Sequence, residues 1–353
     1  MELGRRDVVG LGAGALFAAF SSRALFAQDA KPSALLANVD PELRPAAEQM
    51  LKANGPARPW TRAMLADIRS HTPPPAARRT DVPVEQRRIP GQAGQPEVTV
   101  WIVNARKGSS RPGILHTHGG GFILGTAQGE LAYLQGIAHD LDCVIVSVEY
   151  RLAPETSFTG SIEDNYSGLQ WLHRNADMLG IDRNRIVAMG ESAGGGHAAL
   201  LALAARDRGE IRLAAQILVY PMLDDRTGSA VMPPPSIGAL GWNADANRFG
   251  WQTFLGQAPG GHDVPAAAVP ARRNDLAGLP PTFIGVGGID LFVSEDITYA
   301  RRLTEANVPT ELVVVPGAYH GFDRAAAETS VAQRFNKAKY NALRRAFGQP
   351  VVV

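Results

Sequence analysis

From residue 113 onward, short apolar runs alternate with longer stretches that have helical patterns or are rich in alanine. The apolar runs predict strands at about 113–117, 143–148, 185–189, 214–220, 282–287 and 311–315. The intervening stretches predict helices at about 128–141, 161–178, 193–207, 294–306 and 325–347. Such alternation favours βαβ units, and therefore an α/β fold with a mostly parallel sheet that is covered by helices on both faces.

The region before this alternation has a different pattern. Residues 28–80 contain helical patterns at 41–52 and 61–69 and end in the proline-rich break "HTPPPAARRT". The runs "VEQRRIP" and "PEVTVWIVNA" follow, and because "GQAGQ" separates them they predict a hairpin. We therefore expect a small helical segment that precedes the first strands of the sheet.

Residues 222–275 interrupt the alternation and divide the expected core into 81–221 and 276–353. The interruption contains Trp242 and Phe249 among prolines and glycines. An insertion between late strands of an α/β sheet overhangs the carboxyl edge, where ligands bind. These aromatic rings are thus candidates for the wall of a substrate pocket, and they can equally close a small core of the insertion itself.

The first 27 residues have the layout of a secretory signal. The pair Arg5-Arg6 precedes an apolar, glycine-rich and alanine-rich run from Val8 to Phe20, and small residues follow near Ala27. The adjacent arginines favour the twin-arginine route, so we expect a periplasmic or secreted protein. An ordinary buried helix is the alternative, but the glycines in this run disfavour it.

Charge and cysteine content narrow the function classes. The 353 residues include 35 Lys and Arg against 34 Asp and Glu, which gives no basic surface for nucleic acid. We expect no stable membrane insertion once the signal is removed. Cys143 is the single cysteine, and its run "CVIVSV" predicts a buried, inert thiol. No Cys/His spacing resembles a zinc site, so we expect neither a metal nor another cofactor.

The stretch "MGESAGGGH" contains the pattern G-x-S-x-G, with Ser192 at its centre. An apolar run ends in Gly190, and an alanine-rich helical run begins soon after Gly194. In that context Ser192 is expected at a sharp strand-to-helix turn, where the flanking glycines avoid a clash. A glycine-rich connection without chemistry is the alternative, so the assignment of Ser192 as a nucleophile depends on its partners.

A serine nucleophile needs a base, and the base needs an orienting acid. "VVVPGAYHGFD" places His320 in a turn after a late strand, and "FIGVGGIDLF" places Asp290 after the preceding strand. Glu295 and Asp296 are rival acids, but they fall about one turn into the next helix, where we expect them to cap it or to pair with arginines. The chain order Ser192, Asp290, His320 is that of the α/β-hydrolase triad.

"ILHTHGGGF" supplies consecutive glycines directly after a strand. Backbone N–H groups of Gly119 and Gly120 can turn towards one point there and, together with the N–H of Ala193, bind an oxyanion. His118 and Gly121 are expected to support this loop. A phosphate-binding loop is the alternative, but no Lys-Ser or Lys-Thr follows the glycines.

In combination, five motifs resemble those of the bacterial hormone-sensitive-lipase-like esterases, family IV of the α/β-hydrolase superfamily. They are HGGGF at 118–122, EYRLAPE at 149–155, GESAGG at 190–195, LAGLPPTFIGVGGIDLF at 276–292 and YHGF at 319–322. The resemblance covers residues 35–347. Two departures affect the loop after Asp290, because Leu291 and Ser294 stand where the family often has proline and an acid.

The resemblance implies an α/β-hydrolase core with a helical cap built from 28–80 and 222–275. It also implies cofactor-free hydrolysis of short- to medium-chain carboxylic esters through an acyl-enzyme. Ser192 would be the nucleophile, His320 the general base and acid, and Asp290 the residue that orients His320.

We further expect Phe122, Trp242 and Phe249 to line the substrate pocket. We expect a small-molecule ester as the binding partner and a monomer or homodimer as the assembly. A lactonase, an amidase or a sugar deacetylase would use the same triad. A non-catalytic receptor of the same fold is the remaining alternative, and the presence of all three triad members argues against it.

Overall fold

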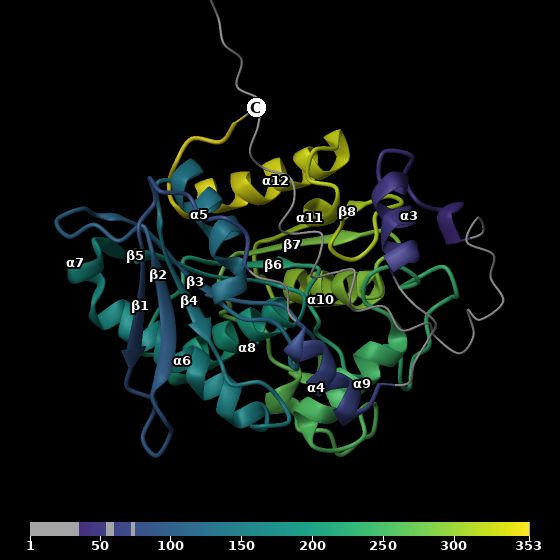
Figure 1. Ribbon diagram of the computed structural model, residues 1–353. Helices are drawn as coiled ribbons and strands as arrows, with labels where there is room; N and C mark the ends of the chain where they lie inside the picture. Colours follow the sequence, from purple (N-terminus) through teal and green to yellow (C-terminus); the bar gives the residue numbers. More distant parts are fainter. Residues whose placement is uncertain (1–34, 54–59, 72–74, 353) are drawn as a thin grey trace, which may run out of the picture.

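The computed structural model describes residues 35–53, 60–71 and 75–352 (Figure 1). The predicted signal at residues 1–27 lies outside these residues. One mixed sheet of eight strands runs through the described chain, in the order β1-β2-β4-β3-β5-β6-β7-β8. Its strands are β1 (Val84–Ile89), β2 (Val98–Val103), β3 (Arg111–Thr117), β4 (Val144–Glu149), β5 (Ile181–Glu191), β6 (Ala215–Val219), β7 (Thr282–Gly287) and β8 (Thr310–Val315).

The pairing of the strands confirms the predicted architecture. β1 and β2 form the antiparallel hairpin, and β2 also pairs antiparallel with β4. The pairs from β4 through β3, β5, β6 and β7 to β8 are all parallel. The carboxyl ends of β3, β5, β7 and β8 therefore lie along one edge of the sheet, and the loops that follow them carry the predicted oxyanion loop, nucleophile, acid and base.

Helices cover both faces of the sheet, as Figure 1 shows. One face packs against α5 (Leu131–Asp140), α11 (Phe322–Ala325) and α12 (Ser330–Ala346). The other face packs against α6 (Phe158–Arg174), α8 (Ala193–Arg208) and α10 (Val293–Glu305). Each face has its own cluster of buried aliphatic and aromatic side chains, so the sheet separates two apolar layers.

Two predicted helices are wrong in their extent. The helix expected at 161–178 divides into α6 and α7 (Ala176–Leu179). The helix expected at 325–347 divides into α11 and α12, because the side chain of Thr329 accepts the N–H of Ala332 and starts a new helix there.

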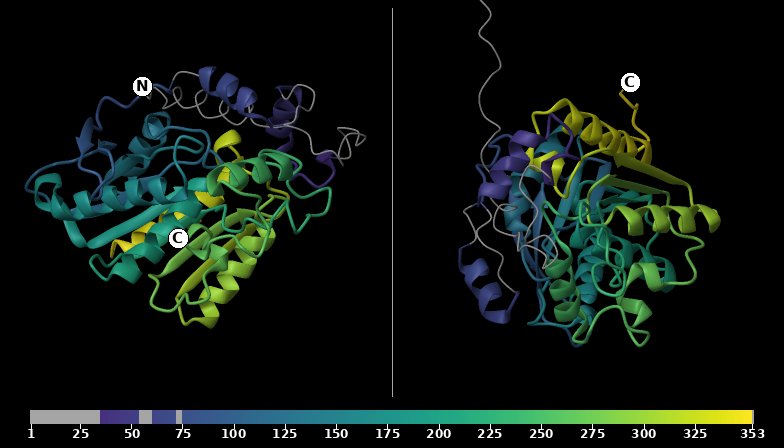
Figure 2. Two further views of the ribbon diagram at one scale, coloured as in Figure 1. Left: turned by 90° about the horizontal axis from the view of Figure 1, so that it is seen from below. Right: turned by 90° about the vertical axis from the view of Figure 1, so that its right-hand side faces the viewer.

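The N-terminal helices α3 (Arg44–Ala53) and α4 (Arg62–Ser70) lie outside the sheet on one side of the molecule (Figure 2). α3 packs near α12, since Glu42 accepts hydrogen bonds from the N–H and the hydroxyl of Ser330. α4 is fixed by Arg69, whose guanidinium donates to the carbonyl oxygens of Ile123 and Ala153, 2.8 Å from each. Together these contacts attach the segment before β1 to two separate parts of the core.

The segment between β6 and β7 contains α9 (Ala244–Leu255) and two short 3-10 turns, η2 (Ala266–Ala268) and η3 (Pro270–Arg272). α4 and α9 lie beside each other in Figure 1, and the rings of Trp60 and Phe249 are 5.7 Å apart. The fully buried Asp225 accepts two hydrogen bonds from Arg272 and one from the N–H of Gly260. This buried ion pair closes the segment on itself, so the segment is an ordered unit with its own packing.

Among the described residues, every helix is too short or too polar to cross a bilayer. Cys143 is buried as predicted, and burial raises the pKa of its thiol to about 12. At neutral pH the thiol is thus protonated and unreactive.

His197 of α8 lies inside an aromatic cluster. The rings of Phe122, Tyr150 and Phe254 surround its imidazole at centroid distances of 5.0, 4.5 and 5.5 Å. Neither ring nitrogen has a hydrogen-bond partner among the described residues. Burial, with a smaller effect of His118, lowers the pKa of His197 to about 3. The imidazole is therefore a neutral packing group.

This burial gives a pH dependence of stability with a definite sign. Between about pH 6.5 and pH 3 the unfolded chain binds a proton at His197 that the folded chain excludes, so stability falls as the pH falls. We expect the wild type to lose about 2 kcal/mol more unfolding free energy between pH 7 and pH 5 than His197→Leu. Urea unfolding of both proteins at the two pH values measures this difference, and identical losses would contradict it.

Candidate active site

Ser192 stands at a strained turn between β5 and α8. Its backbone has φ 56° and ψ −124°, a conformation that residues with a Cβ rarely adopt. Two hydrogen bonds hold it there: the N–H of Ser192 donates to Val219 (2.9 Å), and the N–H of Met222 donates to the carbonyl of Ser192 (2.9 Å). A Cβ at Gly194 would lie 2.0 Å from the carbonyl oxygen of Thr117, which explains why glycine is required after the serine.

The three predicted triad side chains meet at the carboxyl edge of the sheet. The Oγ of Ser192 is 3.0 Å from Nε2 of His320, and Nδ1 of His320 is 2.8 Å from Oδ2 of Asp290. The other carboxylate oxygen of Asp290 accepts the N–H of Phe292 at 3.0 Å. Asp290 is completely buried, whereas Ser192 retains 5% of its exposure. With Nδ1 donating to Asp290, Nε2 accepts the hydrogen bond of the Ser192 hydroxyl and can take its proton.

The rival acids Glu295 and Asp296 do not reach His320 in any hydrogen bond between described residues. Glu295 accepts the backbone N–H groups of Leu223 and Asp224. Asp296 is fully buried, and neither of its carboxylate oxygens has a partner among the described residues. Both side chains lie in the first turn of α10, where an acid can cap the helix, and neither forms an ion pair with an arginine among the described residues.

Burial accounts for the state of these two acids. It raises the pKa of Glu295 and of Asp296 well above their usual values, and the proximity of other carboxylates acts in the same direction. These shifts favour the neutral form of both carboxyl groups, which needs no cation as a partner.

The predicted oxyanion loop follows β3 and lies against the nucleophile. A Cβ at Gly119 would be 3.5 Å from the Cβ of Ser192, so the glycine backbone is close to the serine side chain. Within the described part of the chain, the N–H groups of Gly119, Gly120 and Ala193 donate no backbone hydrogen bond. Donors at the end of β3 and at the start of α8 are thus available beside Ser192.

His118 supports this loop through its neighbours. Nδ1 of its imidazole is 2.8 Å from the carbonyl oxygen of Gly119, and the hydroxyl of Tyr150 donates to the carbonyl oxygen of His118 at 2.6 Å. The rings of His118 and Tyr150 stack at 4.1 Å. Burial lowers the pKa of His118 and so favours its neutral ring, although Nε2 lies 3.9 Å from a carboxylate oxygen of Glu149, which acts in the opposite direction.

Aromatic side chains of the inserted segment and of the N-terminal region lie over the loop. Trp242 contacts Gly121 so closely that a Cβ there would be 2.3 Å from two carbons of the indole. The indole N–H donates to Asn247, which fixes the ring. Trp60 packs against both Trp242 and Phe249, at 5.9 and 5.7 Å between ring centroids. Phe249 is half-buried, and Trp242 is almost completely buried.

Phe122 is placed differently from the other two predicted pocket residues. It is 1% exposed and stacks on Phe254 at 4.0 Å. Its backbone φ is 66°, and its carbonyl accepts the N–H of Ala153. Its contacts are those of a core residue beneath the oxyanion loop, and its role in the pocket stays a prediction.

A buried polar network behind the nucleophile has no counterpart in the sequence predictions. Glu191 accepts hydrogen bonds from Tyr133 at 3.2 Å and is 2.9 Å from Nε2 of His116. Nδ1 of His116 is 2.9 Å from the hydroxyl of Ser147. Burial raises the pKa of Glu191, but His116, Arg324 and Lys339 outweigh it and lower that pKa to about 2. A negative charge is therefore held one residue before the nucleophile.

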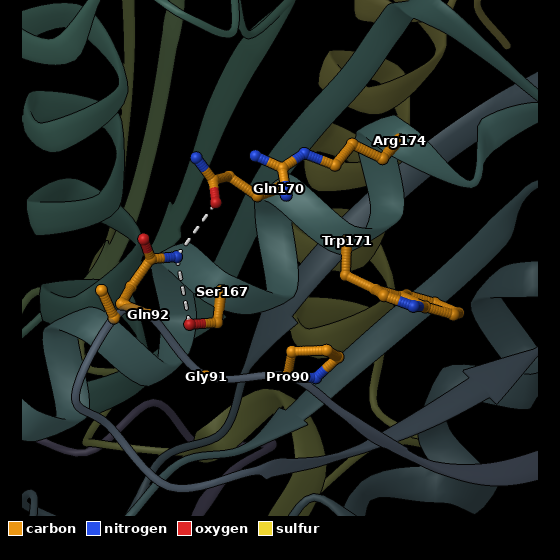
Figure 3. Close-up of a pocket in the computed structure, with 8 residues that line it drawn as sticks. Pro90, Gly91, Gln92, Ser167, Gln170, Trp171 and Arg174 are labelled. Atoms are coloured by element: carbon orange, nitrogen blue, oxygen red, sulfur yellow. Dashed lines mark hydrogen bonds between the residues drawn. The ribbon is translucent and has the colours of Figure 1, made fainter.

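A polar pocket lies away from these residues (Figure 3). The turn after β1 and one side of α6 form it, and the amide of Gln92 donates to Ser167 and Gln170. No triad residue lines it. In the described ranges, no group of three His, Cys, Asp or Glu side chains could hold a metal ion.

Comparisons with known proteins agree with this geometry. The model of a family described by its α/β-hydrolase fold matches residues 114–324. Esterase LipI of Mycobacterium tuberculosis is 31% identical over 269 residues, which cover 74% of this chain and 80% of the relative. Carboxylesterase NlhH of the same organism is 33% identical over 297 residues, which cover 81% and 88%.

A solved structure described as a bacterial heroin esterase superposes with a TM-score of 0.76 at 34% identity. The match covers 88% of this chain and 99% of that one. Esterase LipW from Mycobacterium marinum superposes with a TM-score of 0.74 at 32% identity over 88% of this chain and 97% of that one. The chain therefore belongs to the α/β-hydrolase family, among its hormone-sensitive-lipase-like esterases.

Proposed function

We propose that this carboxylic ester hydrolase cleaves short- to medium-chain esters through a covalent intermediate on Ser192. The observation that carries the proposal is the unbroken line of hydrogen bonds from Asp290 through His320 to Ser192. The named activities of LipI and NlhH, an esterase and a carboxylesterase, support the same substrate class.

The geometry gives each group one task. As the Oγ of Ser192 attacks the ester carbonyl, its proton moves to Nε2 of His320, and the negative charge on Asp290 stabilises the imidazolium. The carbonyl oxygen becomes an oxyanion that the N–H groups of Gly119, Gly120 and Ala193 bind. Collapse of the tetrahedral intermediate breaks the ester bond, and His320 returns the proton to the departing alcohol.

The second half of the reaction repeats these steps with water. His320 removes a proton from the water as it attacks the acyl-enzyme, and the acid leaves when His320 reprotonates Ser192. Every step uses protons and electron pairs that the substrate, water and these side chains supply, so the mechanism requires no cofactor.

We also propose that residues 28–80 and 222–275 act as the cap and that Trp242 and Phe249 limit the acyl chain. Their support is the contact of Trp242 with the oxyanion loop and the packing of both rings on Trp60.

Export through the twin-arginine route remains a further proposal. It rests on Arg5-Arg6 and the apolar run that follows. The amino terminus of the mature protein, determined by sequencing, tests it: a start near Gln28 supports export and cleavage.

Removal of the nucleophile tests the proposed function directly. Ser192→Ala should lower kcat for p-nitrophenyl butyrate by about 10⁶-fold, because no other described group replaces the attacking oxygen. The same variant should no longer be labelled by an organophosphate, as mass spectrometry of the intact protein would reveal. Labelling that persists in Ser192→Ala would reject the mechanism. A parallel panel of lactones and amides distinguishes the related hydrolases.

Asp290 and its neighbour Asp296 form a matched pair of buried acids. Asp290→Asn should cost about 10⁴-fold in kcat, since the amide favours the wrong tautomer of His320. Asp296→Asn should retain activity, because Asp296 makes no hydrogen bond to His320 among the described residues and burial favours the neutral carboxyl that the amide resembles. Steady-state kinetics of both variants measure the contrast, and equal losses would move the acid's role away from Asp290.

Truncation of Trp242 or Phe249 should change the enzyme's preference for the length of the acyl chain. We expect Trp242→Ala and Phe249→Ala to raise kcat/KM for an octanoate ester relative to an acetate ester by about tenfold, because the space for the acyl group increases. Both variants should still react with a small organophosphate at Ser192. An unchanged ratio of octanoate to acetate in both would show that these rings do not bound the acyl pocket.

A further inference from the structure

Tyr220 lies between the segment that holds the nucleophile Ser192 and the imidazole of the base His320. It follows β6 with a backbone φ of 36°, and its N–H donates to the carbonyl of Gly285. Its neighbour Val219 accepts the N–H of Ser192, and Met222, two residues further on, donates to the carbonyl oxygen of Ser192. A bulky residue with positive φ is strained, and such strain persists only where the surroundings enforce it.

The ring of Tyr220 packs on the other side against the base. Its centroid is 4.7 Å from that of the His320 imidazole, at an interplanar angle of 63°. Phe292 makes a second edge contact with the same imidazole at 5.2 Å and 85°. The hydrogen bonds to Ser192 and Asp290 act in the plane of the imidazole, whereas Tyr220 and Phe292 restrict the rotation of that plane.

The hydroxyl of Tyr220 is anchored deep in the protein. It donates to Oδ1 of Asp323 at 2.9 Å, and Oδ2 of Asp323 is 3.4 Å from Nζ of Lys339 on α12. Lys339 also donates to the hydroxyl of Tyr133 at 2.9 Å, and that hydroxyl donates to Glu191. Asp323 and Lys339 are buried almost completely. The network thus joins Tyr220 to Glu191, one residue before Ser192, and passes through Asp323, three residues after His320.

A contribution to folding stability does not by itself explain the buried pair of Asp323 and Lys339. Burial of a carboxylate and an ammonium group has a large desolvation cost, and an apolar pair of similar volume is often as stable or more so. A fixed charge pair does, however, hold the phenol in one orientation, because Asp323 offers its oxygen from one direction. The hydroxyl bond then determines where the ring of Tyr220 meets His320.

We propose that Tyr220 is a positioning residue for the esterase reaction, with Asp323 and Lys339 as its anchor. The Tyr220–Asp323–Lys339 anchor keeps the His320 imidazole at the height and tilt that bring Nε2 within hydrogen-bond distance of Ser192. This role rests on the proposed function of the triad, because Tyr220 acts through His320 and does not contact the substrate carbonyl.

Tyr220→Phe tests the anchor, since it removes the hydroxyl and keeps the ring. We expect kcat to fall about 10- to 100-fold with KM changed by less than about twofold, because small misplacement of a catalytic group slows chemistry without weakening binding. Titration with an organophosphate counts the active sites, so that kcat is expressed per reactive serine. A merely structural role would reduce the number of titrated sites and leave kcat per site unchanged.

Tyr319→Phe is the matched control. Tyr319 is also fully buried and precedes His320 directly, but its hydroxyl has no hydrogen-bond partner among the described residues. We expect its kcat to equal that of the wild type. An equal loss in Tyr319→Phe and Tyr220→Phe, or no loss per site in Tyr220→Phe, would overturn the proposal.

Lys339→Met extends the test to the far end of the anchor. It should lower kcat per site in the same way, and the double variant with Tyr220→Phe should lose no more than the larger single loss, since both changes break one network. Additive losses would refute the shared anchor. Ser192→Ala, assayed in parallel, distinguishes failure of the proposed triad from failure of the Tyr220 proposal. If the organophosphate still labels Ser192→Ala, the triad is rejected. If it does not, the triad stands, and the kcat per site of Tyr220→Phe alone decides the role of Tyr220.

Discussion

The backbone conformation of Ser192 is the constraint on which the rest of the site depends. With φ at 56°, the serine cannot relax into β5 or into α8, and the hydrogen bonds to Val219 and from Met222 hold it between them. Its side chain therefore projects from the edge of the sheet instead of into either apolar layer. The close approach of Gly194 to Thr117 follows from the same turn, because β3 and β5 are adjacent strands.

Around this turn, the surroundings give chemically similar acids different states. Glu191 keeps its charge because two cations and His116 lie close to it. Burial and the proximity of other carboxylates raise the pKa of Glu295 and Asp296, which favours their protonated forms. Asp290 differs from both, since a backbone N–H and the imidazole satisfy its two oxygens. The position of an acid in the sequence says little about its protonation state, whereas the groups that contact its carboxyl account for it.

This difference shows how far sequence reasoning reaches. The strands and the order of Ser192, Asp290 and His320 could be predicted, because apolar runs and turn motifs are local and parallel strands bring their carboxyl ends together. The break between α11 and α12 could have been found from Thr329, a residue that favours the start of a helix. The partners of Glu191 and Tyr220 could not, because they lie 58 to 103 residues away in the chain and their contacts follow no local period.

The site is also discontinuous in the chain, since the oxyanion loop, the nucleophile, the acid and the base follow β3, β5, β7 and β8 in turn. β8 is the last strand of the sheet, at its outer edge, and His320 follows it. During synthesis on the ribosome, a nascent chain that has completed β3 to β7 thus carries a serine without a base. Hydrolytic activity would therefore arise late, when the last strand adds to the sheet, and an incompletely synthesised chain would not hydrolyse esters in the cell.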